Sequence, residues 1–129
     1  MSVAGTSEHG IPGIFLGTAR GVITPTTGSD LSGFITRVEP MTGVHDDLYA
    51  GAMVWAEDVA LSNAAALVTL DVVDFERREV ATIRERIAGL AGIPAGRVGV
   101  TCTHTHGGPA TMPGGRLGRC DAGYLDGVC

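Results

Sequence analysis

The residues best suited to chemistry stand in one short run, Thr103-His104-Thr105-His106-Gly107-Gly108-Pro109. Two histidines at positions i and i+2 project to the same side of an extended chain. Neutral imidazole is the commonest protein ligand for metal ions. The neighbouring hydroxyls and glycine amides are groups that can orient such ligands through hydrogen bonds. This run therefore predicts a metal or catalytic site, and the alternative interpretation is a polar loop exposed to solvent.

A histidine pair needs partners, because a catalytic zinc ion usually has three protein ligands and one open position. Asp71 follows an apolar run and offers a carboxylate, although an aspartate there can equally order a loop. His45 begins the cluster His45-Asp46-Asp47, which is also typical of a solvated acidic turn. Cys102 lies in an apolar run and is interpreted as a small core residue.

The elements that must position these residues are predicted from hydrophobic periodicity. Residues 65–73 are β-branched and almost continuously apolar, which is typical of a strand buried on both faces in a parallel sheet. Asp74 is then expected to cap a helix. The helix is indicated by apolar residues spaced by 3, 4 and 3 positions, namely Val80, Ile83, Ile87 and Leu90. Residues 97–103 predict a second buried strand.

A strand, a helix and a strand in this order predict a parallel βαβ unit with a right-handed crossover. The expected fold class is therefore α/β, with a mixed sheet that contains this unit. Ligands of open α/β sheets bind beyond the carboxyl ends of the strands. Asp71 is expected near one such end, and His104 and His106 just past the next. We therefore expect these three residues to converge on one edge of the sheet, with His45 nearby.

The remaining segments are less regular. Residues 1–13 are expected to be a loose leader, because glycine, proline and small polar residues give it little to bury. Residues 14–129 are expected to form the domain proper. Within it, residues 14–23 and 48–55 favour extended chain, residues 34–38 a short strand, and residues 121–128 the beginning of a helix.

Composition excludes some classes of function. The 129 residues include 9 Arg and no Lys against 14 acidic residues, a net charge of -5, so the clustered positive charge of nucleic-acid binders is missing. The longest charge-free apolar stretch, residues 59–70, is shorter than the about 18 residues of a membrane helix. No signal-peptide pattern opens the sequence, and three cysteines do not suit a disulfide framework. A cytoplasmic location is therefore expected.

Four segments, in this order, resemble the N-terminal part of the neutral/alkaline non-lysosomal ceramidases. GTARGVITP (17–25) is similar to the opening strand of that family and its Thr-Pro end, and GVHDDLYAGAMV (43–54) to its Gly-hydrophobic-His segment. LVTLDVV (67–73) resembles its strand ending in Leu-Asp, and TCTHTHGGP (101–109) its Thr-His-Thr-His signature. The resemblance covers roughly residues 17–125.

The resemblance implies a zinc-dependent amidase that hydrolyses the N-acyl bond of ceramide-like lipids to a sphingoid base and a fatty acid. By position, His104 would be a zinc ligand, and His106 and Asp71 would be catalytic residues. His45 would lie near the site. Secreted family members stand against the cytoplasmic expectation.

The family enzymes are several times longer, and their remaining zinc ligands lie beyond the last residue of this sequence. Residues 1–129 are therefore expected to be an incomplete, N-terminal portion of a larger catalytic domain, inactive alone. Apolar surface left exposed would favour self-association.

Two other readings stay open at this point. One is a different metal-dependent hydrolase with a His-x-His pair, such as an amidohydrolase barrel, which needs repeated βα units. The other is a non-catalytic, truncated remnant.

Overall fold

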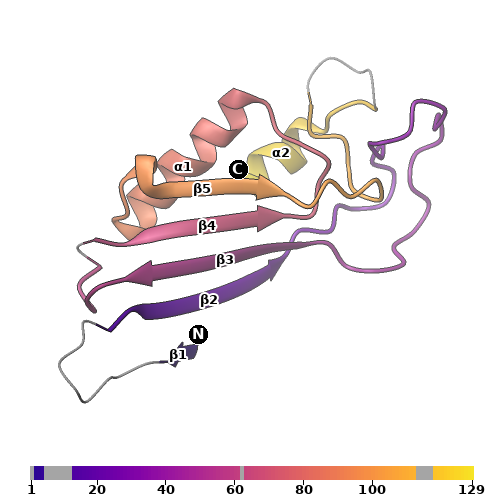
Figure 1. Ribbon diagram of the computed structural model, residues 1–129. Coiled ribbons are helices and arrows are strands. Elements are labelled where there is room, and N and C mark those ends of the chain that lie inside the picture. Colours follow the sequence, from indigo (N-terminus) through magenta and orange to yellow (C-terminus); the bar gives the residue numbers. More distant parts are fainter. Residues whose placement is uncertain (1, 5–12, 62, 113–117) are drawn as a thin grey trace.

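The computed structural model describes residues 2–4, 13–61, 63–112 and 118–129. Within these ranges a five-stranded sheet has the order β1-β2-β3-β4-β5 (Figure 1). The strands are β1 (Ser2–Ala4), β2 (Phe15–Val22), β3 (Tyr49–Ala56), β4 (Ala65–Leu70) and β5 (Val98–Cys102). Two helices, α1 (Arg77–Ala91) and α2 (Ala122–Val128), and a 3₁₀ turn (Ala95–Arg97) complete the fold. Residues 5–12 of the expected leader lie outside the described ranges, and residues 2–4 pair with β2.

The sheet is mixed, as the sequence predicts. Strands β1 to β4 pair antiparallel, whereas β4 and β5 run parallel, with Ala66 opposite Val98 and Leu70 opposite Cys102. The helix α1 connects the parallel pair, so the predicted βαβ unit is confirmed. Both strands end earlier than expected, at Leu70 and Cys102, because the chain bends into the loops that carry the polar residues.

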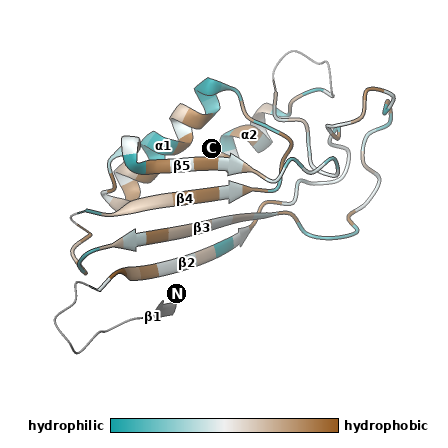
Figure 2. Ribbon diagram, in the orientation of Figure 1, coloured by the Kyte–Doolittle hydropathy of each residue, from teal (hydrophilic) through white to brown (hydrophobic). Residues whose placement is uncertain are grey.

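Both helices lie on the same face of the sheet (Figure 1). Alternate residues of β4, such as Ala66 and Leu70, are buried beneath them. Leu67 points to the opposite face with Trp55 and Met53, and all three side chains are more than a third exposed. The expectation that residues 65–73 are buried on both faces is therefore wrong for the described part of the chain. Figure 2 shows apolar segments in β2, β3, β4 and β5, with a strongly apolar start of β2.

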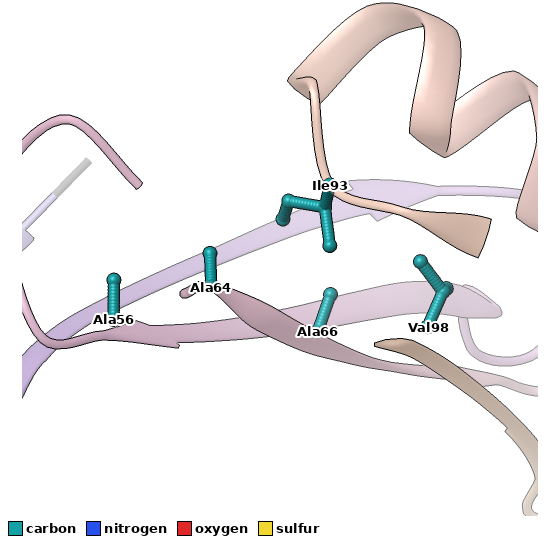
Figure 3. Packing of buried hydrophobic residues seen from close by; sticks show 5 residues of the cluster. All are labelled: Ala56, Ala64, Ala66, Ile93 and Val98. Atoms are coloured by element: carbon teal, nitrogen blue, oxygen red, sulfur yellow. The ribbon is translucent and has the colours of Figure 1, made fainter. Parts of the chain in front are cut away.

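The sequence prediction for the helix α1 is wrong in one detail at its C-terminal end. Val80, Ile83 and Ile87 pack toward the sheet as expected, but Leu90 is 89% exposed. The chain turns back at Gly92, whose φ of 70° is left-handed, and Ile93 takes the core position at that end. Figure 3 shows Ile93 above the small side chains of Ala56, Ala64 and Ala66, beside Val98.

The predicted N-cap is also wrong. The helix begins after Glu76, whose side chain makes no capping bond. The Asp74 carboxylate instead accepts a hydrogen bond from the backbone N–H of Phe75 at 2.8 Å. Two residues separate Asp74 from the first helical residue, so its oxygen is out of reach of the free N–H groups of the first turn.

Residues 34–38 do not form the predicted strand. Arg37 donates its backbone N–H to the carbonyl of Phe34 at 3.1 Å, which closes a turn. Gly33, with a φ of 104°, directs the chain into that turn. The helix expected near residue 121 is confirmed, because the Asp121 carboxylate accepts hydrogen bonds from the N–H groups of Gly123 and Tyr124. In the described ranges, no helix has the length and apolar character needed to cross a membrane.

Candidate active site

The loops that carry the candidate residues gather at one end of the sheet (Figure 1). Asp71 directly follows β4, and His104 lies two residues beyond β5. The parallel pair brings these ends together, since Thr103 donates its backbone N–H to Leu70 O at 3.0 Å. The long loop from residue 23 to residue 48 reaches the same end. The topology thus places the predicted polar residues where α/β sheets bind ligands.

His104 is held in an uncommon conformation. Its φ is 60°, in the left-handed region that non-glycine residues rarely adopt. Its backbone N–H donates to Val72 O at 3.1 Å, and its Nδ1 lies 2.9 Å from Val73 O. A carbonyl oxygen can only accept, so Nδ1 carries the proton. In neutral His104 the lone pair of Nε2 is then available for a metal ion.

The two histidine rings lie close together. Their centroids are 5.3 Å apart and their planes are inclined by 60°. The alternation of an extended strand predicts that both rings project to one side, but β5 ends at Cys102 and the left-handed turn at His104 intervenes. His106 is half-buried, whereas His104 is more exposed.

Asp71 makes its contacts with β3. Its backbone N–H donates to Tyr49 O at 2.9 Å, and its Oδ2 accepts from the Tyr49 N–H at 2.8 Å. These two bonds extend the β3–β4 ladder by one residue. They match the loop-ordering role that the sequence left open for this aspartate.

The charge of Asp71 also acts on the helix α2. Burial raises the pKa of the Tyr124 phenol to about 12, and the negative charges of Asp71 and Cys129 add to that effect. The Tyr124 hydroxyl oxygen is buried and has no hydrogen-bond partner among the described residues. The aspartate therefore couples the start of β3 to the titration of a residue on α2.

This coupling predicts a titration result. Asp71→Asn keeps an acceptor for Tyr49 but removes the charge, so the Tyr124 pKa should fall from about 12 toward its ordinary value of 10.0. Tyrosinate absorbance against pH, measured in a Tyr49→Phe background, reports Tyr124 alone, because the chain has 2 Tyr. An unchanged Tyr124 pKa in Asp71→Asn would contradict the coupling.

The same shift has a consequence for stability. Because the folded-state pKa of Tyr124 is raised, its contribution is complete below the unfolded-state pKa of about 10 and is lost as the pH rises toward about 12. The free energy of unfolding in urea should therefore decline over this window. The decline should be smaller in Asp71→Asn, whose folded-state pKa lies closer to the unfolded value.

His45 lines a cavity that two residues of the His-x-His run, Thr105 and Gly107, also line. The cavity measures about 320 Å³, and Val44 and Asp46 complete the part of its lining next to His45 in the sequence. The His45 side chain is exposed, and its Nδ1 lies 2.6 Å from Asp46 Oδ2. His45 therefore shares a cavity with the loop that carries the histidine pair.

The loop that carries His45 is anchored by Thr24. Its hydroxyl donates to Asp47 Oδ1 at 2.8 Å and accepts from the Leu48 N–H at 2.9 Å. The Thr-Pro end of the first long strand thus has a structural task, which is to fix the start of β3 beside the cavity.

The described residues do not form a complete metal site. Among them, no three His, Cys, Asp or Glu side chains are arranged to hold a metal ion. Cys102 packs into the core cluster around Leu70, as expected. Burial, with a smaller contribution from the charge of Asp74, raises the pKa of its thiol.

Three functional residues escaped the sequence analysis. Gly33, Phe34 and Arg37 contact His106 from a segment about 70 residues earlier. Phe34 and Arg37 fall in the short strand predicted for residues 34–38, directly after Gly33, and nothing in that pattern indicates a long-range contact.

Comparison with known proteins identifies the fold. No protein-family model and no curated protein matches this sequence. Among solved structures, a neutral ceramidase from Pseudomonas aeruginosa aligns with a TM-score of 0.65 and 21% identity over 75% of this chain. A structure described as ceramidase complexed with C2 aligns over the same share with a TM-score of 0.61 and 22% identity. The match spans 16% and 15% of those chains, so this chain shares the fold of a small part of a ceramidase.

Proposed function

On a fold shared with part of neutral ceramidase, we propose that this chain supplies the His104–His106 part of a zinc-dependent amide hydrolase. Its substrate is a ceramide-like lipid, whose N-acyl bond is cleaved to a sphingoid base and a fatty acid. The observation that carries the proposal is the bond between His104 Nδ1 and Val73 O at 2.9 Å, which leaves Nε2 free beside the His106 ring. The remaining zinc ligands come from outside the described residues.

The donor chemistry of His104 fits zinc. Metal-binding histidines almost always donate their second ring N–H to a carbonyl, a carboxylate or water, which fixes the tautomer and the ring orientation. Val73 O serves this purpose here. A bound zinc ion supplies polarisation of the amide carbonyl and a water of lowered pKa.

His106 is the proton-handling group of the proposal. Hydrolysis adds water to the acyl carbon and breaks the C–N bond, and the departing nitrogen must gain a proton. An imidazole is suited to that transfer near neutral pH. Its ring centre lies 5.3 Å from that of His104, so the two imidazoles are close enough to act on the same amide group.

We assign Asp71 to positioning and not to proton transfer, since its Oδ2 already accepts from the Tyr49 N–H. The Asp71 carbonyl oxygen would lie 3.0 Å from a Cβ on Gly108, so the residue also supports the turn after His106. His45 lines the cavity and in this proposal meets a polar group of the substrate.

The topology disfavours the amidohydrolase-barrel alternative. Such barrels are built from parallel strands that alternate with helices. Here β2, β3 and β4 form an antiparallel meander before the single parallel pair.

The proposal is tested by zinc-dependent hydrolysis of a ceramide with a fluorescent acyl chain. The assay uses the longest polypeptide that the reading frame of this chain encodes. We expect turnover that is lost on chelation and restored by zinc in the wild type. In His104→Ala, zinc should restore less than about 1% of it, since a ligand is missing. Hydrolysis that survives chelation, or a zinc-loaded protein that leaves ceramide intact, would overturn the proposal.

A further inference from the structure

Two segments far apart in sequence lie side by side behind the His-x-His run. Leu31 pairs antiparallel with Pro109, and Ser32 donates its backbone N–H to Gly108 O at 2.9 Å. Ser32 and Pro109 are almost fully buried. The chain that follows His106 is therefore fixed to the loop of residues 30–37.

Gly33 brings this loop directly against the His106 ring. A Cβ at position 33 would lie 2.4 Å from His106 Cγ and 2.7 Å from His106 Cβ, closer than real atoms approach. The φ of Gly33 is 104°, which side chains rarely adopt. Because Gly33 has no side chain, its backbone packs directly against one side of the His106 imidazole.

Phe34 and Arg37 complete the enclosure. The Phe34 ring meets the His106 ring edge to face, with centroids 4.9 Å apart and planes at 84°. Arg37 Nη1 donates to His106 O at 2.9 Å and to Ser32 O at 3.2 Å. The Arg37 guanidinium also lies over the Phe34 ring, 4.9 Å from its centroid. The Arg37 guanidinium therefore contacts the backbone of both segments and also the Phe34 ring.

We propose that Phe34 and Arg37 are positioning residues that, with Gly33, hold the His106 imidazole in a single orientation. We call these three residues the His106 clamp. The part that the His106 ring takes in hydrolysis rests on the proposed function. The contacts that hold the ring do not depend on that function. A reacting group held in one geometry needs no further ordering when the substrate binds, so the clamp should favour turnover.

The side-chain rotamer of His106 tests the clamp on the 129-residue chain. Three-bond couplings about χ1, measured on labelled protein, should indicate one rotamer in the wild type. In Arg37→Met and Phe34→Leu they should be averaged over several rotamers. Phe34→Tyr preserves the ring and should restore the single rotamer, and Arg78→Met, an exposed change on α1, should leave it unaltered.

Phe34 is 52% exposed, so Phe34→Leu should fold even if Arg37→Met does not. A single His106 rotamer in a folded Phe34→Leu protein would overturn the role of Phe34. The same result in a folded Arg37→Met protein would overturn that of Arg37, and if Arg37→Met is unfolded, Arg37→Lys is measured in its place. Lysine cannot donate to two carbonyls in the planar geometry of arginine, so averaging is expected there too.

A kinetic measurement separates this inference from the proposed function. In the polypeptide that hydrolyses ceramide, Phe34→Leu should lower kcat about tenfold and leave KM within about twofold, since orientation and not binding is lost. Rotamer averaging with unchanged kcat would show that the clamp does not serve the reaction. If the wild type hydrolyses no ceramide, the proposed function fails, while the rotamer data still decide whether the clamp exists.

Discussion

His106→Ala should lower kcat for ceramide hydrolysis by about 10²- to 10⁴-fold, the usual contribution of a positioned acid–base group. The zinc content should remain as in the wild type, because His104 keeps its bond to Val73 O and its free Nε2. The measurement is steady-state hydrolysis together with metal analysis of the same preparation. His45→Ala is the informative comparison, since His45 lines the cavity without contacting either histidine of the pair in the proposal, and its loss is expected to change KM more than kcat.

Two results would contradict the role given to His106. One is hydrolysis by His106→Ala within tenfold of the wild type. The other is loss of zinc in that variant, which would make His106 a metal ligand in place of a proton-handling group.

Gly33→Ala should be the most destabilising small substitution in the loop of residues 23–48. The alanine must adopt a φ of 104°, and its Cβ would overlap His106 Cγ at 2.4 Å. Backbone strain of this kind costs about 1–3 kcal/mol, and displacement of the imidazole adds to it. Urea unfolding should therefore show a loss of more than about 2 kcal/mol, together with shifted His106 ring resonances.

Gly28→Ala is the matched control for this prediction. Gly28 has a similar φ of 94°, but a Cβ there meets nothing within 4 Å. In Gly28→Ala, the free energy of unfolding should thus fall by the backbone strain alone, and the His106 resonances should not shift. Equal losses of stability in the two variants would mean that the close approach of Gly33 to His106 does not stabilise the fold.

Hydrophobic periodicity predicted the part of the fold that positions the site. The β-branched run before Asp71, the helical stripe around Ile83 and the apolar run before His104 identified the βαβ unit, because burial against a helix imposes those patterns. Asp71 and His104 were accordingly expected at one edge of the sheet, where they lie. The exposure of Leu90 was missed, since the turn at Gly92 that puts Ile93 into the core leaves no periodic signal.

The local geometry of the site could not be predicted in the same way. The left-handed φ of His104 and its bond to Val73 O depend on how two loops meet, and not on the residues that flank the histidine. The His106 clamp joins Gly33 and Arg37 to a residue about 70 positions later. Single-sequence patterns report local conformation and burial, so contacts of this kind appear only once the chain is folded.

The role of His104 as a zinc ligand is tested most directly by long-range ¹H–¹⁵N spectra of its ring during a zinc titration of the same polypeptide that is used in the hydrolysis assay. Before zinc is added, neutral His104 should carry its proton on Nδ1, the atom that lies 2.9 Å from Val73 O. Zinc should then shift the Nε2 resonance while Nδ1 stays protonated. A proton on Nε2 in the neutral ring, or a zinc-induced change at Nδ1 with Nε2 unaffected, would contradict the account.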